Sequence, residues 1–112
     1  MRRLFPLGAV CLFLLTGCAS RSLYYWGSYE PSIYNMYIVP DKATVDRQII
    51  DFEADIQKAR SKDQKLPPGF YAHLGYLYFQ QGNSELAKRA FESEKAAFPE
   101  STVLMDRMIS NL

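Results

Sequence analysis

The residues and motifs that mark most catalytic sites are scarce in this chain. Its 112 residues include two cysteines and a single histidine, His73, which precedes an apolar helix position and is expected to be packed or half-exposed. The chain contains no nucleophile motif of the hydrolases, no zinc-protease motif and no glycine-rich phosphate loop. Asp51 and Asp55 form a carboxylate pair one helical turn apart, but without a metal partner such a pair is typical of surface charge. We therefore expect no enzyme, no metal site, no cofactor and no small-molecule substrate.

A surplus of charge of either sign is also missing. The formal net charge is +1, and residues 18–112 carry eleven basic and twelve acidic side chains. A nucleic-acid-binding domain needs a basic face, so the sequence predicts no nucleic-acid partner. The length fits one small domain, which excludes large multidomain enzymes.

Long hydrophobic runs are absent as well. The run Leu4–Leu15 has no charge but is too short for a membrane-spanning helix, which needs about 20 residues. It follows Arg2 and Arg3, and this order of charge and apolar residues is that of an export signal. The next residues, Leu15-Thr16-Gly17-Cys18, resemble the lipobox of bacterial lipoproteins. The sequence thus predicts a lipoprotein signal peptide over residues 1–17, with an ordinary secretory signal as the alternative.

The lipobox resemblance implies a modification of Cys18. In such proteins the cysteine thiol receives a diacylglycerol, the signal is cut before the cysteine, and the new amino terminus is acylated by a fatty acid such as palmitate. Two or more acyl chains hold a protein stably on a bilayer, so the resemblance implies a lipid anchor at Cys18. Cys11 would leave with the signal, and no intramolecular disulfide could then form.

Ala19 follows the expected lipidation position. In lipoproteins of Gram-negative bacteria, an aspartate at this place is the usual signal for retention in the inner membrane. Its absence predicts a lipid-anchored protein of the outer membrane that faces the periplasm, with surface display as an open alternative.

An aromatic segment follows the expected anchor, within residues 18–40. Residues 23–40 contain five tyrosines and the only tryptophan, and Gly27, Pro31 and Pro40 argue against a regular helix or a central strand. We therefore expect an extended chain with turns. Three roles remain open: packing on the helices that follow, an aromatic belt at the membrane interface, and a surface for a partner or glycan. The candidate binding residues here are Tyr24, Tyr25, Trp26 and Tyr29.

A helix is predicted over residues 44–60. Apolar side chains recur there at intervals of three and four residues, which places them on one face of a helix. They are Val45, Ile49, Phe52, Ile56 and Ala59. Polar side chains occupy the other faces: Asp46, Arg47, Gln48, Glu53, Asp55 and Lys58. The charged ones are expected to be solvated. Asp41 or Thr44 is expected to cap the first turn, since a short side-chain oxygen accepts from its free amides.

Residues 68–101 resemble the tetratricopeptide repeat, a pair of antiparallel helices. The matching residues are Tyr71, Leu74, Gly75, Tyr78, Gly82, Ala87, Phe91 and Pro99. Gly75 and Ala87 are small where the helices cross, and Gly82 allows the turn. The expected helices span residues 69–80 and 84–98, with Asn83 capping the second. Glu94 departs from the pattern, which usually has a small residue there.

A single repeat does not form an array. The helix at 44–60 does not repeat the pattern, and Ser101 is expected to cap a last helix in which Leu104, Met105, Met108 and Ile109 are apolar. Three or more stacked units normally form a continuous core, so the core is expected to be thin. The predicted fold class is mostly α, with a tetratricopeptide-like helical hairpin and flanking helices over residues 41–112, preceded by the extended aromatic segment.

Three features taken together resemble a family of small proteobacterial lipoproteins of unknown function. They are the lipobox, the run Tyr24-Tyr25-Trp26-Gly27-Ser28-Tyr29-Glu30 and the repeat-like C-terminal half. Genes of that family often lie beside one for a lipoprotein similar to the curli-secretion channel subunit. The resemblance implies an envelope complex as partner and brings no catalytic residue.

The function expected from the sequence is that of a lipid-anchored adaptor that binds another cell-envelope protein. Repeat hairpins bind through side chains of their first helix, and Tyr71, Tyr76 and Phe79, with Ala72 and Gln80, are the positions expected outside the hairpin seam. The alternative is a structural lipoprotein whose aromatic segment contacts peptidoglycan or the membrane surface.

Overall fold

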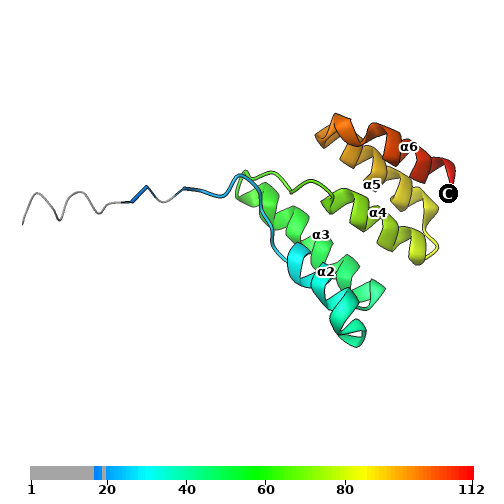
Figure 1. Ribbon diagram of the computed structural model, residues 1–112, viewed down its shortest axis with the longest axis horizontal. Coiled ribbons are helices and arrows are strands. Elements are labelled where there is room, and N and C mark those ends of the chain that lie inside the picture. Colours follow the sequence, from blue (N-terminus) through cyan, green and yellow to red (C-terminus); the bar gives the residue numbers. More distant parts are fainter. Residues whose placement is uncertain (1–16, 19) are drawn as a thin grey trace, which may run out of the picture.

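The helical hairpin expected over residues 68–101 lies at the centre of the structure. It consists of α4 (Phe70–Gln80) and α5 (Ser84–Ala97), with α3 (Val45–Ser61) packed on α4 and α6 (Thr102–Ser110) packed on α5. The structure is a computed structural model that describes residues 17, 18 and 20–112. Figure 1 shows the N-terminal segment entering at one side of the helices and the C-terminus at the opposite side. The mostly helical fold class is confirmed.

The turn and the crossing of the hairpin follow from small and capping residues, as expected. Gly82 has a φ of +83°, which only glycine adopts without strain. The side-chain oxygen of Asn83 accepts from the backbone N–H of Leu86 at 3.1 Å and caps α5. A Cβ at Gly75 would lie 2.6 Å from the ring of Phe91, so the two helices cross too closely for any side chain there.

The core is formed by the apolar faces of α3, α4 and α5. The predicted stripe of α3 points inward, and Thr44 rather than Asp41 caps this helix by accepting from the N–H of Arg47. The largest fully buried side chains are Phe52, Phe70, Phe91, Leu77 and Pro67. The rings of Phe52 and Phe70 stack with their centroids 4.5 Å apart.

The aromatic segment differs from its expected extended form. Residues 20–28 contain no helix, but Tyr29–Ile38 form helix α2, and the 3-10 turn η1 (Pro40–Lys42) follows. Pro31 does not break α2 because it is the third helical residue, where the backbone N–H has no partner within the helix. The prediction of extended chain is therefore wrong for residues 29–38.

The last helix is present but begins differently from the prediction. A 3-10 turn, η2 (Pro99–Ser101), precedes α6, and the hydroxyl of Ser101 donates to the carbonyl of Phe98 instead of capping α6. Met105 is buried, with Met108 and Ile109 packed beside it. Leu104 is 57% exposed, so it does not join this core.

Candidate functional site

The aromatic motif, residues 24–30, fastens its segment to α3. The backbone N–H of Ser28 donates to Asp55 Oδ2 at 2.8 Å, and the hydroxyl of Ser28 donates to the same oxygen. Gly27 has a φ of +45°, and a Cβ there would lie 2.6 Å from the Asp55 carboxylate oxygens. Asp55 is only 3% exposed. The prediction that it is solvated is wrong, because the motif replaces water around its carboxylate.

Tyr29 places one ring of the motif against the core. Its centroid lies 6.0 Å from those of both Phe52 and Phe70 and 6.4 Å from that of His73. Burial raises the pKa of the Tyr29 hydroxyl, and the negative charge of Glu94 raises it further. Of the roles open to the aromatics, Tyr29 therefore takes packing on the helices.

Glu94, the residue that departs from the repeat pattern, connects α5 to the beginning of α4. It is 3% exposed, and its Oε1 accepts from the N–H of Gly69 at 2.7 Å. Gly69 has a φ of +90°, and a Cβ there would lie 2.6 Å from the hydroxyl oxygen of Tyr29. The second carboxylate oxygen, Oε2, is buried without a hydrogen-bond partner among the described residues. Glu94 thus turns toward α4 and the aromatic motif.

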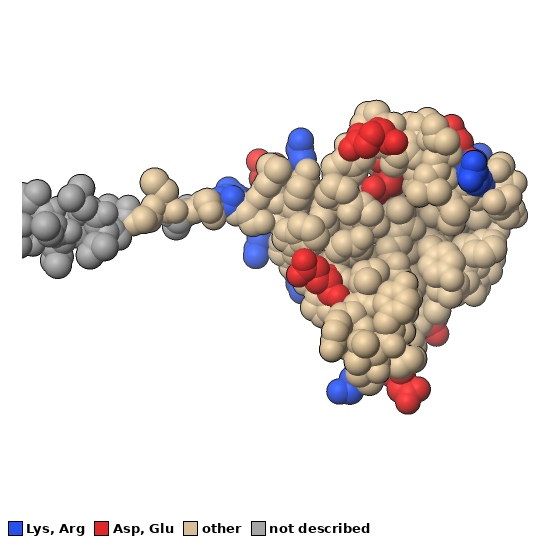
Figure 2. Space-filling model, viewed as in Figure 1, with Lys and Arg blue, Asp and Glu red and all other residues tan. Residues whose placement is uncertain are grey.

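The chain before the motif is held on the loop that follows α3. Tyr25 N–H donates to the carbonyl of Lys65 at 2.8 Å, and Gln64 Nε2 donates to the carbonyl of Ser22 at 2.9 Å. The ammonium of Lys62 lies 5.2 Å from the centre of the Tyr25 ring. We call the described chain before the motif, residues 20–23, the tether, and this side of the domain the tether end. Figure 2 shows basic side chains gathered where the N-terminal segment meets the domain.

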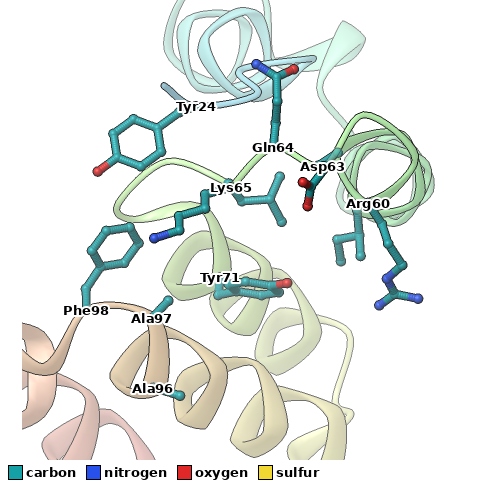
Figure 3. A pocket seen from close by; sticks show the side chains of 12 residues that line it. Tyr24, Arg60, Asp63, Gln64, Lys65, Tyr71, Ala96, Ala97 and Phe98 are labelled. Carbon is teal, nitrogen blue, oxygen red and sulfur yellow. The ribbon is translucent and has the colours of Figure 1, made fainter. Parts of the chain in front are cut away.

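A groove of about 570 Å³ opens at the tether end. Its walls come from Tyr24, the end of α3, the following loop, Tyr71 of α4 and the end of α5. The rings of Tyr24 and Phe98 meet edge to face with centroids 6.2 Å apart. Figure 3 shows the side chain of Lys65 pointing toward the part of the groove where these two rings lie. Arg60 also lines the groove. The cationic groups of Arg60 and Lys65 suit an anionic group, and Asp63 in the same lining offsets part of their charge.

A smaller, apolar pocket of about 170 Å³ lies between α4 and α6. It is lined by Phe79, Phe91, Met108, Asn111 and Leu112. Tyr76 lies one turn before Phe79 on α4, and Leu104 one turn before Met108 on α6, and both are exposed. Helical spacing places each on the same face of its helix as the pocket residue. We call the pocket with Tyr76 and Leu104 the α4–α6 trough.

The structure divides the candidate binding residues among these places. Tyr24 and Tyr71, 47 positions apart in the chain, line the same groove at the tether end. Trp26 is 41% exposed beside Tyr24, and Tyr25 lies under Lys62.

The remaining candidates from the hairpin lie in the α4–α6 trough. Tyr76 is 39% and Phe79 is 46% exposed. Both positions lie outside the hairpin seam, as the repeat pattern predicts.

The buried polar side chains around His73 form hydrogen bonds that explain their burial. His73 Nε2 and Gln48 Oε1 are 3.0 Å apart, and Gln48 Nε2 donates to the carbonyl of Ala43 at 2.7 Å. Burial lowers the pKa of His73. Gln48 is buried, although it lies outside the predicted apolar stripe of α3. No group of three or more potential metal-ligating side chains occurs among residues 17, 18 and 20–112.

The expected anchor region is described only in part. Cys18 is exposed and not in a disulfide. Ala19 and residues 1–16 of the expected signal peptide lie outside the described residues. Within the part of the chain that the structure describes, no helix is long and apolar enough to cross a bilayer.

A family model described as a domain of unknown function (DUF4810) matches residues 23–108. The chain belongs to this family. No curated protein and no solved structure gives a significant match to the chain. The matched part of the DUF4810 chain begins just before the aromatic motif and ends within α6. The motif and the hairpin therefore belong to one family unit, which agrees with the packing of Tyr29 in the core.

Sequence reasoning missed several residues that build the tether end of the DUF4810 domain. Glu94 carried a signal, since it replaces a small residue of the repeat pattern. Asp55 and Lys65 carried none, because their partners lie in the aromatic segment, far away along the chain. Phe98 follows the last residue of α5, and only the return of Tyr24 to this place makes it part of a groove.

Proposed function

We propose that this chain is a lipid-anchored periplasmic adaptor that binds another cell-envelope protein in the α4–α6 trough. The observation that carries the proposal is an apolar pocket lined by the exposed side chain of Phe79, with the exposed side chain of Tyr76 one turn before it on α4. Contiguous exposed apolar surface, unlike single scattered apolar residues, is typical of interaction sites. Aromatic side chains in such clusters are frequent anchors for a protein partner.

The form of the trough favours an apolar or amphipathic segment as the bound element. Two helices, α4 and α6, border it, and Phe91 of α5 closes its floor. A partner helix binds in such a place by laying side chains three and four residues apart into the groove. A partner would also stabilise this small domain, because it binds the folded form only.

The anchor part of the proposal rests on sequence. The lipobox before Cys18 and the alanine at position 19 support acylation and sorting to the outer membrane. The resemblance to lipoproteins encoded beside a curli-channel-like subunit supports a secretion or envelope complex as the partner.

Co-purification from detergent-solubilised membranes tests the adaptor. Wild-type protein is expected to retain one envelope protein at fixed stoichiometry, and Phe79→Glu is expected to lower its recovery at least about tenfold, because a charge would enter the apolar pocket. The matched control is Ile50→Glu, since Ile50 is an exposed apolar residue of α3 that lines neither the groove nor the pocket. Equal recovery with Phe79→Glu and Ile50→Glu contradicts the assignment of the trough.

The alternative function is that of a structural lipoprotein whose aromatic segment contacts peptidoglycan or the membrane surface. The exposed ring of Trp26 beside Tyr24 favours it. Retention of the protein on isolated cell-wall sacculi without a stoichiometric protein partner, and loss of that retention in Trp26→Ala, would support this alternative over the adaptor.

A further inference from the structure

Basic side chains outnumber acidic ones at the tether end, whereas the rest of the described chain has more acidic side chains than basic ones. The exposed basic side chains of the tether end form what we call the basic collar: Arg21, Lys58, Arg60, Lys62 and Lys65. Asp63 is the one acidic residue in the segment 56–65 that supplies four of them. The other described residues carry six basic and eleven acidic side chains. The domain is therefore electrically polarised, with its positive side where the tether leaves.

The basic collar and the tether are joined in one arrangement. The guanidinium of Arg21 donates to the carbonyl of Lys62, and the contacts of Ser22 and Tyr25 with the loop after α3 continue from there. The position of the collar relative to Arg21 is thus set by hydrogen bonds within the domain.

The chain between Cys18 and Arg21 is too short to move the collar far from an anchored cysteine. Three residues span at most about 11 Å when fully extended. The Debye length at physiological salt is about 8 Å. If Cys18 is in a bilayer, the collar lies within reach of the headgroup charges, where basic residues beside an anchor bind anionic lipids.

We propose that the basic collar docks on the anionic headgroups of the bilayer that holds Cys18. This inference rests on the lipid anchor in the proposed function and extends it. Docking gives the domain one orientation, with the groove of Tyr24, Lys65 and Phe98 beside the headgroups. Phe79 and Leu112 in the α4–α6 trough then lie at the side away from the membrane, because α4 and α6 both run away from the tether end (Figure 1).

Fluorescence of Trp26 gives a direct readout, since it is the only tryptophan in the chain. The lipoprotein is purified from membranes in detergent and reconstituted into vesicles that contain brominated lipid as a contact quencher. One vesicle type is phosphatidylcholine alone, and the other contains equal parts of phosphatidylcholine and phosphatidylglycerol. Quenching is expected in the anionic vesicles at about 0.01 M salt and is expected to disappear at about 1 M salt, where the Debye length is about 3 Å.

Two matched triple variants assign the effect to the collar. The first is Lys58→Gln, Arg60→Gln and Lys65→Gln, which keeps Arg21 and Lys62 and hence the tether contacts. It is expected to lower the ratio of docked to undocked protein about 100-fold, at about fivefold for each charge near an anionic surface. The control removes equal charge from exposed sites elsewhere, by Lys42→Gln, Lys88→Gln and Arg107→Gln, and is expected to match the wild type.

Several outcomes overturn the proposal and remain distinct from failure of the adaptor. Equal quenching in neutral and anionic vesicles, or equal loss in the two triple variants, shows that charge does not hold the collar on the bilayer. Protein that floats with the vesicles but shows no quenching is anchored without docking. Protein that does not float has no lipid anchor, and this result overturns docking as well.

If the collar variant docks normally but loses its co-purified partner, the collar binds an acidic protein instead. The vesicles contain no partner, so none of their results tests the α4–α6 trough.

Discussion

At the tether end of the domain, the exposed basic side chains of Arg60 and Lys65 line a groove together with the aromatic rings of Tyr24, Tyr71 and Phe98. At the other end, between α4 and α6, the pocket is lined by Phe79, Met108 and Leu112, with Asn111 as the polar member. The two ends share one hydrophobic core. They differ in the chemistry of their exposed side chains. This difference is the basis of the two contacts that we propose, an electrostatic one at the tether end and an apolar one away from it.

The tether end also depends on long-range contacts, whereas the trough is built from neighbouring helices. Tyr29, Ser28 and Tyr25 reach α3, α4 and the loop after α3 from the N-terminal segment. The trough uses α4, α5 and α6, which follow one another along the chain. Changes in the aromatic motif should therefore disturb the tether end first.

Removal of the thiol at the expected lipidation site should give the largest effect. Cys18→Ser is expected to abolish incorporation of labelled palmitate and to leave unprocessed or soluble protein, because no thiol remains to accept the diacylglycerol. Ala19→Asp serves as the comparison, since it should keep the label and move the protein to the inner membrane fraction in a host with the usual sorting rule. Label retained by Cys18→Ser contradicts the lipoprotein assignment.

Overpacking of the hairpin should lower the stability of both ends together. Gly75→Leu is expected to reduce the free energy of unfolding by about 3 kcal/mol, because even a Cβ at this position would lie 2.6 Å from Phe91. Thermal melting followed by circular dichroism measures the helices, and Trp26 fluorescence measures the tether end. Coincident transitions are expected. A tether end that melts separately would show that the aromatic motif is not part of the cooperative core.

Weakening the buried contact of Asp55 should act on the tether end more than on the trough. Asp55→Asn is expected to cost about 2 kcal/mol of folding free energy, since the carboxylate accepts two hydrogen bonds from Ser28. Asp51→Asn is the matched control on the same helix, and its exposed pairing with Arg47 should contribute less than about 0.5 kcal/mol. Denaturant unfolding measures both, and equal losses would contradict the fastening role of Asp55.

The pH dependence of His73 should give the smallest effect. Burial lowers the pKa of His73 below its usual value of 6.5, so protons bind the unfolded chain more readily than the folded one. The contribution of neutral His73 to the free energy of unfolding is complete above pH 6.5. It is lost as the pH falls through that value toward the pKa of His73 in the folded protein. His73→Gln should show a shallower fall in stability over this range in denaturant unfolding at a series of pH values. An unchanged slope would mean that His73 does not titrate differently in the two states.

The local features of the hairpin could be predicted because their signals lie within a few residues of each other. Gly82, Asn83 and the close crossing at Gly75 act on adjacent turns or on the repeat spacing, and the structure confirms each of them. The apolar stripe of α3 is confirmed for the same reason, since helical periodicity is a local property. The secondary structure of the aromatic segment could not be predicted in this way. Proline breaks a helix in its interior but is tolerated in the first turn, and the sequence did not show that α2 begins just before Pro31.

The sequence predicts a lipid anchor at Cys18, which stays a prediction. By itself, it determined the helical hairpin, the apolar stripe of α3 and the exposure of Tyr76 and Phe79. These follow from periodicity, small residues at fixed spacing and a local motif. Only the tertiary structure decided that Asp55 and Glu94 are buried and that Tyr24 and Tyr71 line one groove. It also placed the basic residues around the tether. The physical reason is that a charge is buried or grouped by partners distant in the chain, and no periodic pattern in one sequence identifies those partners.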